Sequence, residues 1–129
     1  MQRFTSWARA HGDVSALGLI GSWARGTARP DSDVDIVLLT RSVDDYARDP
    51  SWVRDLLGAE FLGTRAWGAI TEIRLALPSR LEVEVDVGDP SWAATDPVDA
   101  GTRAVVRDEL RILHDPEGLL GRLTEACRR

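Results

Sequence analysis

One segment of the chain alternates strictly between apolar and acidic residues: Leu81-Glu82-Val83-Glu84-Val85-Asp86-Val87. Successive side chains of a β-strand point to opposite faces, so this pattern predicts a strand that buries its apolar residues and presents Glu82, Glu84 and Asp86 on the other face. A strand with one buried face must lie in a sheet that packs against other elements. Three carboxylates on one face repel one another, so a positive partner is expected beside them.

A second predicted strand also carries paired acids, in Asp33-Val34-Asp35-Ile36-Val37-Leu38-Leu39. Period-two geometry places Asp33 and Asp35 on one face. If the two strands are neighbours in one sheet, carboxylates from both converge, and like charges about 4 Å apart repel by roughly 4 kcal/mol at an effective dielectric of 20. Oxygen ligands favour Mg²⁺ or Mn²⁺. The sequence lacks the set of cysteine and histidine ligands that zinc prefers, because Cys127 is the only cysteine. We therefore expect a divalent-cation site.

The apolar run from Leu17 to Ile20 predicts a buried strand that breaks sharply at Gly21-Ser22, followed by a short helix from Ser22 to about Thr27. Free backbone N–H groups at a helix start and a serine hydroxyl suit a phosphate, and glycine permits its close approach. Arg25 and Arg29 could face the same anion. Metal-binding acids opposite a phosphate site are what a nucleoside triphosphate and its divalent ions require.

The remaining pattern predicts a mixed α/β or α+β fold in one domain over residues 1–129. A strand over Ile70–Leu77 is expected to form a hairpin with the Leu81–Val87 strand through a loop around Pro78 to Arg80. Arg111-Ile112-Leu113 is interpreted as a short link. Helices are expected over four segments, namely Gln2–His11, Ser51–Leu57, Pro97–Leu110 and Pro116–Cys127.

Composition narrows the classes of function. All 16 basic residues are arginine, so a phosphate-loop lysine and a Schiff-base lysine are excluded. A net charge of −5 argues against a duplex nucleic-acid partner. No apolar run approaches the roughly 20 residues of a membrane helix and no signal peptide is evident, so we expect a cytoplasmic protein. Five tryptophans are expected in the core or an interface rather than as base-stacking platforms, although Trp23 lies close to the phosphate turn: Trp7, Trp23, Trp52, Trp67 and Trp92.

Gly21-Ser22, ten intervening residues, Asp33-Val34-Asp35 and a later strand carboxylate resemble the nucleotidyltransferase superfamily related to DNA polymerase beta, in its small, single-domain minimal form. The resemblance implies a mixed sheet flanked by helices, with two Mg²⁺ ions held by three carboxylates. It assigns the triphosphate to Gly21 and Ser22, and both metals to Asp33 and Asp35. The third acid would activate the acceptor hydroxyl. Glu84 is our first choice for it, being central on its face and matching a glutamate in small relatives, ahead of Asp86 and then Glu82.

The resemblance implies transfer of a nucleoside monophosphate, AMP from ATP, to a hydroxyl acceptor with release of pyrophosphate. The acceptor is a small molecule or a protein, and a homodimer or a partner protein would complete the site, because larger relatives carry an additional helical domain for the acceptor. An alternative is an antitoxin-type adenylyltransferase that modifies a partner toxin protein. A further alternative is a catalytically inert module for nucleotide binding or protein interaction.

Overall fold

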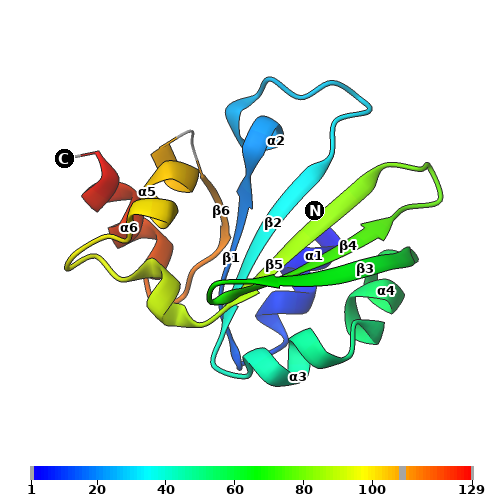
Figure 1. The fold of residues 1–129 in the computed structure, drawn as a ribbon, viewed down its shortest axis with the longest axis horizontal. Helices are drawn as coiled ribbons and strands as arrows, with labels where there is room; N and C mark the ends of the chain where they lie inside the picture. Colours follow the sequence, from blue (N-terminus) through cyan, green and yellow to red (C-terminus); the bar gives the residue numbers. More distant parts are fainter. Residues whose placement is uncertain (1, 108–109, 129) are drawn as a thin grey trace.

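A six-stranded mixed sheet forms the centre of the computed structural model, which describes residues 2–107 and 110–128. The strand order across the sheet is β3-β4-β5-β2-β1-β6 (Figure 1). Neighbouring strands are antiparallel except for the parallel pair of β2 and β5. The strands are β1 (Val14–Ile20), β2 (Val34–Thr40), β3 (Glu60–Trp67), β4 (Ile70–Ala76), β5 (Glu82–Gly88) and β6 (Arg111–His114).

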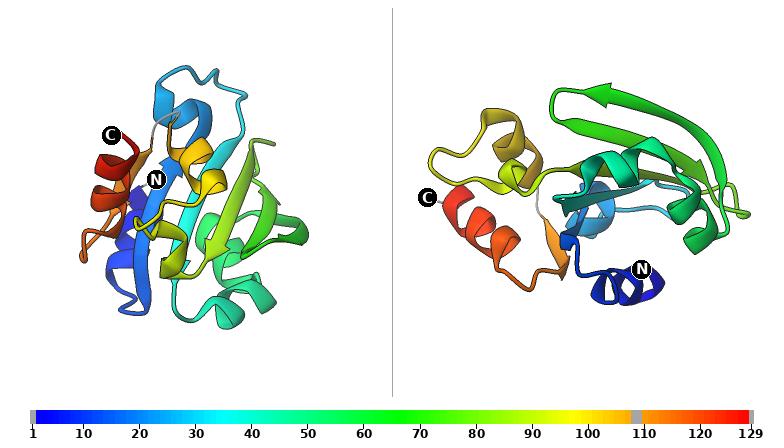
Figure 2. Two further views of the ribbon diagram at one scale, coloured as in Figure 1. Left: turned by 60° about the vertical axis from the view of Figure 1, so that its left-hand side comes forward. Right: turned by 90° about the horizontal axis from the view of Figure 1, so that it is seen from below.

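Helices pack on both faces of this sheet, in two groups that lie apart from each other (Figure 2). One face carries α1 (Gln2–Arg9), α3 (Val43–Arg48) and α4 (Ser51–Leu57). The other carries the 3₁₀ helix η1 (Pro90–Ala93), α5 (Ala100–Arg107) and α6 (Leu119–Cys127). The short α2 (Gly21–Arg25) follows β1 directly. Within the described ranges, no helix has the length and apolar character needed to cross a bilayer.

Alternation along the strands divides the core into two clusters. Ile36 and Leu38 of β2 and the valines of β5 pack against Phe4 and Tyr46 on the face of α1, α3 and α4. Val37 and Leu39 of β2 face the other cluster, which includes residues from η1, α5 and α6. Both faces of β1 and most of β2 are therefore buried, whereas β5 buries only alternate residues. The acidic face of β5 is left at the edge of the second helix group.

The structure confirms the mixed α+β class and the hairpin of β4 and β5. Helix α4 occupies the predicted range Ser51–Leu57. The predicted Leu81–Val87 strand corresponds to β5. It lies beside β2, which is the neighbour relation that the two acidic segments need in order to converge. Apolar periodicity was sufficient for these elements because each buries a regular face.

One element was assigned to the wrong class. Arg111–Leu113, interpreted as a link, lies within β6, which pairs antiparallel with β1. Only four residues long, with Ile112 exposed at the sheet edge, β6 has no periodicity to reveal it. The predicted helix over Pro97–Leu110 is shorter, as α5, and its positions 108–109 lie outside the described residues. The prediction also omitted α3, β3 and η1.

Most of the tryptophans have structural roles, as expected. Trp7 and Trp52 stack with ring centroids 4.8 Å apart and pack, with Phe4, against the first core cluster. Trp92 packs against the second cluster. The Trp23 side chain packs on the first cluster, and its indole nitrogen donates to the carbonyl oxygen of Ser32 at 2.9 Å. The Trp67 side chain is not among the described groups.

We predict that Leu38→Ala destabilises the protein by about 2–5 kcal/mol, because it leaves a cavity beneath the central strand of the first cluster. Leu38 is fully buried, whereas Ile112 on β6 is 42% exposed, which makes Ile112→Ala the matched control. Urea unfolding followed by tryptophan fluorescence measures both. Equal costs for the two variants would contradict the assignment of β2 to the centre of the sheet.

Candidate active site

The end of β1 meets the start of β2 at a glycine. Gly21 follows Ile20, which is the register partner of Asp35 on β2, and Gly21 has a φ of +74°. A Cβ atom on Gly21 would lie 2.6 Å from Oδ2 of Asp35. Glycine is thus required here both by the backbone conformation and by the close approach of the carboxylate. The predicted phosphate turn and the predicted metal ligand Asp35 are in direct contact.

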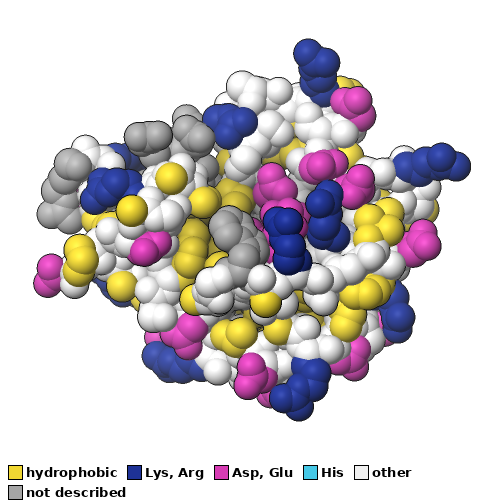
Figure 3. Space-filling model, in the orientation of Figure 1, with side chains coloured by type: hydrophobic (Ala, Val, Ile, Leu, Met, Phe, Trp, Pro, Cys, Tyr) yellow, Lys and Arg dark blue, Asp and Glu magenta, His cyan; other side chains and the backbone are white. Residues whose placement is uncertain are grey.

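Asp35 also lies beside the acidic face of β5. In the parallel pair of β2 and β5, Asp35 is opposite Glu84 and Val37 is opposite Asp86. Register partners share a face of the sheet, so the carboxylates of the two strands stand side by side. Acidic side chains accordingly gather over the middle of the sheet, next to basic ones (Figure 3). The two acidic strands are neighbours, as the predicted convergence required, but the carboxylate oxygens that gather within 4.8 Å of one another come from β4 and β5 and not from Asp33 or Asp35.

A third strand adds a carboxylate to this face. Glu72 of β4 is the register partner of Asp86 and is only 3% exposed. Glu72, Glu84 and Asp86 each offer an oxygen within 4.8 Å of the others. Oδ1 of Asp86 is buried and has no hydrogen-bond partner within the described chain. Buried oxygens in such a group suit a hard divalent cation that would supply the missing partner.

The carboxylates strongly perturb one another. Burial raises the pKa of Glu84 to about 8, with further increases from its hydrogen bond to Glu72 and from the charges of Asp86 and Asp35. Burial also raises the pKa of Asp86 to about 7, ahead of the charges of Glu72 and Asp35. The pKa of Asp35 rises through burial and then through the neighbouring charge of Asp33. The cluster therefore retains protons near neutral pH, which a bound divalent cation would displace.

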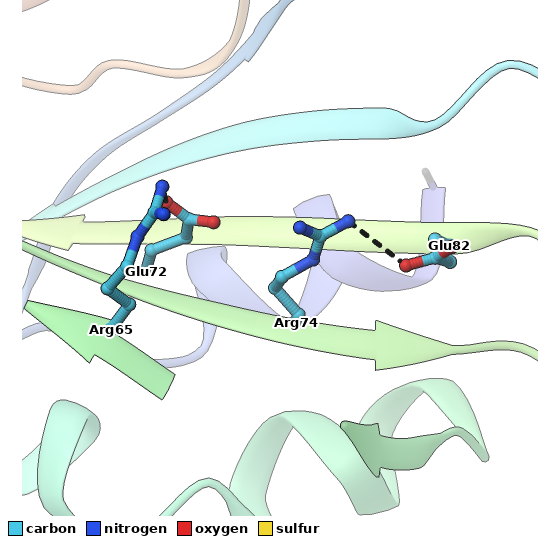
Figure 4. A network of polar contacts seen from close by, with 4 residues as sticks. All are labelled: Arg65, Glu72, Arg74 and Glu82. Atoms are coloured by element: carbon cyan, nitrogen blue, oxygen red, sulfur yellow. Dashed lines mark hydrogen bonds and ion pairs between the residues drawn. The ribbon is translucent and has the colours of Figure 1, made fainter. Parts of the chain in front are cut away.

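Two arginines lie along the open side of this acidic face (Figure 4). Arg65 of β3 contacts Glu72 at 3.2 Å, and Arg74 of β4 contacts Glu82 at 3.1 Å. Arg74 is also the register partner of Glu84, and its charge lowers the pKa of Asp35. The Arg74–Glu82 ion pair is exposed and contributes little to stability, about 0–1 kcal/mol, whereas in the Arg65–Glu72 pair only the arginine is exposed. Their effect on the site is to offset part of the repulsion among the acids.

The other predicted binding residues surround the glycine corner. Ser22 lies in the first turn of α2 and is partly buried, and Asp33 is exposed immediately before β2. Arg25 is exposed in the last turn of α2, and its charge lowers the pKa of Asp35. Arg29 lies in the loop that leads to β2. These residues share one end of the sheet with Asp35.

The register distinguishes the three candidates for the third acid. Glu84 is directly opposite Asp35, whereas Asp86 lies two residues further along β5, opposite Val37. Glu82 is opposite Ala76 on β4 and bonds to Arg74. Glu84 is thus the candidate opposite Asp35, and its role as the third acid stays our proposal.

Sequence reasoning missed Glu72, Arg65 and Arg74. A signal for two of them was available, because a hairpin loop centred on Ser79 places Glu72 opposite Asp86 and Arg74 opposite Glu84, as the structure does. For Arg65, the prediction lacked the strand that carries it, since β3 exposes both Phe61 and Leu62 and shows no apolar alternation.

A family model described as a nucleotidyltransferase domain matches residues 4–85, well over half of the chain. The chain belongs to this nucleotidyltransferase family. The match includes Gly21, Ser22, Asp33, Asp35 and Glu84, and it confirms the resemblance and the class of enzyme predicted from the sequence. It ends one residue before Asp86, so the part of the nucleotidyltransferase domain that contains η1, α5, β6 and α6 lies outside it.

Three similar solved structures are of terminal uridylyl transferases. A structure of Cid1 described by its RNA terminal uridylyl transferase activity has a TM-score of 0.48 and 21% identity, covering 66% of this chain and 27% of that chain. A structure of the Cid1 poly(U) polymerase has a TM-score of 0.46 and 19% identity, with coverage of 66% and 26%. A cytoplasmic RNA terminal U-transferase has a TM-score of 0.47 and 20% identity, with coverage of 66% and 25%.

The nucleotidyltransferase domain thus spans about a quarter of the length of these structures. No curated protein sequence matches the chain.

We predict that Gly21→Ala costs about 1–3 kcal/mol more stability than Gly26→Ala. Both glycines have a φ of +74°, but a Cβ on Gly26 meets nothing within 4 Å, whereas a Cβ on Gly21 meets the Asp35 carboxylate. The difference in the free energy of unfolding therefore isolates that contact from the backbone strain. Equal losses in the free energy of unfolding would show that the Asp35 carboxylate can move away from the added methyl group without a measurable loss of stability.

We predict that the metal-free protein becomes less stable as the pH rises from about 5 to about 8. The pKa of Glu84 is raised from 4.5 to about 8 and that of Asp86 from 3.8 to about 7, so over this range the folded state binds more protons than the unfolded chain. The free energy of unfolding then falls with pH. Urea unfolding in EDTA at a series of pH values measures the slope.

In the same experiment, Glu84→Gln should flatten this slope, because it removes one of the two carboxyl groups whose pKa is raised. Glu60→Gln is the control, since Glu60 is exposed at the start of β3. A wild-type stability that increases between pH 5 and pH 8 would contradict the charge arrangement described here.

Proposed function

We propose that this domain transfers a nucleoside monophosphate, AMP from ATP, onto a hydroxyl group and releases pyrophosphate. The observation that carries the proposal is the contact chain from Gly21 to Asp35 to Glu84: a glycine corner against one carboxylate, and that carboxylate beside a second on the next strand. Membership of the nucleotidyltransferase family supports the reaction class. We take ATP as the nucleotide from the resemblance of the sequence, and a cytoplasmic location stays a prediction.

The triphosphate is proposed to bind at the glycine corner. Backbone amides of Gly21 and Ser22 would donate to phosphate oxygens, and the absence of a side chain at Gly21 lets the chain of phosphates reach the Asp35 carboxylate. Arg25 supplies a positive charge at the same corner, in a chain that has no lysine to do so. This arrangement leaves the α-phosphate over Asp35 and Glu84.

Asp33, Asp35 and Glu84 are proposed to hold the divalent cations, Mg²⁺ or Mn²⁺. The residues present fit such ions, because the donors are all oxygens and because a buried oxygen of the neighbouring Asp86 has no partner. When bound, the ions would polarise the α-phosphate and neutralise the charge that develops on the leaving pyrophosphate. Glu72 and Asp86 lie beside Glu84, and the three residues each offer an oxygen within 4.8 Å of the others.

Glu84 is also proposed to receive the proton of the acceptor hydroxyl. As that oxygen forms a bond to the α-phosphorus, the bond from phosphorus to the bridging oxygen of pyrophosphate breaks, and pyrophosphate leaves toward Gly21 and Ser22. The register supports this role, because Glu84 is the β5 acid directly opposite Asp35. Arg74, opposite Glu84 on β4, lowers the pKa of Asp35 through its charge and so favours the ionised form of that carboxylate.

The test measures binding and turnover separately. ATP with Mg²⁺ should raise the melting temperature of the wild type, and Asp35→Asn should abolish that rise. With labelled ATP and a panel of hydroxyl acceptors, Glu84→Gln should lower transfer by about 10²–10⁴-fold, the usual cost of losing a general base. Pyrophosphate release measures the rate.

Asp55→Asn is the matched control for both measurements, because Asp55 is exposed on α4, on the opposite face of the sheet. A rise in melting temperature that survives Asp35→Asn would contradict the role of Asp35. ATP binding without pyrophosphate release under any divalent metal would instead indicate the inert nucleotide-binding module.

A further inference from the structure

A cavity of about 440 Å³ opens next to the acidic cluster. Its floor is the sheet, at Val37 and Asp86, and one side is the turn between β3 and β4 around Ile70. The opposite side comes from η1 and α5, where Trp92 and Val105 contribute apolar surface. These last residues follow the family-matched region. The volume is in the range of small-molecule sites.

The position of the cavity relative to the glycine corner is defined by the register. Ile20, Asp35 and Glu84 lie in one row across the sheet, next to Gly21. The cavity touches this row at Ile20 and extends over the following row, at Val37 and Asp86, two residues further from Gly21. Phosphoryl transfer needs the attacking oxygen and the leaving oxygen roughly in line through phosphorus. With pyrophosphate toward Gly21, the attacking oxygen comes from the side of the cavity.

We propose that this cavity binds the acceptor, and that the acceptor is a small hydroxyl compound with an apolar body and a neutral or positive charge. The proposal rests on the function proposed above for the direction of attack. Its hydroxyl would approach Glu84 over Asp86, and its body would pack between Ile70, Trp92 and Val105. In this arrangement the nucleobase extends from the α-phosphate away from the cavity, over the open face of β4 and β5.

The lining determines the charge of the occupant. None of the described residues that line the cavity is basic, and two of them, Asp86 and Asp99, are acidic. Asp99 is already engaged, because its Oδ2 accepts from the backbone N–H of Thr102 at 3.1 Å at the start of α5. Asp86 has a buried Oδ1 without a partner in the described chain, at the floor of the cavity. In the metal-free chain, an anionic acceptor would meet this acidic residue with no basic residue in the described lining to offset it.

Three probes that share a phenyl ring and a hydroxyl group test this inference: 2-amino-1-phenylethanol, 1-phenyl-1,2-ethanediol and mandelate. Titration of the full chain, without nucleotide or metal, is followed by saturation-transfer NMR. The cationic and neutral probes should bind, and mandelate should bind at least about tenfold more weakly. Val105→Trp should remove binding by filling the cavity, whereas Ala104→Trp on the exposed side of α5 should not.

If Val105→Trp does not fold, Ser91→Tyr provides a second variant with an obstructed cavity, because Ser91 lines the cavity and is exposed. Absence of binding to the wild type, unchanged binding to the folded blocked variants, or a preference for mandelate would overturn the proposal.

The same probes separate the acceptor from the nucleobase. The wild type should bind 1-phenyl-1,2-ethanediol with an affinity that changes by no more than about twofold when saturating ATP and Mg²⁺ are added, because the two ligands occupy different places. Displacement of the probe by ATP would assign the cavity to the nucleobase and overturn the proposal. If ATP does not bind at all, the proposed function fails, while probe binding without nucleotide still shows whether the cavity accepts this class of compound.

Discussion

The parallel pairing of β2 with β5 is the constraint on which the site depends. It places Asp35 beside Glu84, although 48 residues separate them in the chain. Parallel neighbours need a crossover connection, and here the crossover contains α3, α4 and the strands β3 and β4. The helices of the crossover cover one face of the sheet, and β4 returns beside β5 with Glu72. The connection that makes the pairing feasible thus also supplies a further acid.

The same alternation that builds the core concentrates the charge. Val83, Val85 and Val87 are fixed by packing against the first cluster, so the residues between them cannot turn away from the other face. Their mutual repulsion is a local cost, offset in part by Arg65 and Arg74 and by retained protons. Burial of the valines opposes this cost, at roughly 1.5–3 kcal/mol for each fully buried side chain. A stable scaffold therefore holds an arrangement that favours cations.

Local pattern was enough to predict the acids, the glycine corner and the hairpin, because strand alternation and turn chemistry are short-range properties. The pairing of β2 with β5 was assumed rather than predicted, because alternation along a strand does not indicate which other strand lies beside it. Strands β3 and β6 were missed because both lie at sheet edges, where backbone hydrogen bonds rather than burial of a face keep them in place. Glu72 was missed for another reason: its hairpin was predicted, but the register across the loop was not followed to its partner Asp86.

Uneven coverage of the sheet explains why chemistry and recognition lie where they do. Both faces of β1 and most of β2 are buried, which makes the glycine corner and Asp35 rigid. The second helix group stops at β2, so the acidic face of β5 begins where apolar packing ends. The cavity lies at this boundary, with one wall from residues that follow the family-matched region. Changes in η1 and α5 can therefore alter what enters the cavity without disturbing the register of the carboxylates, because that register depends only on the strands beneath.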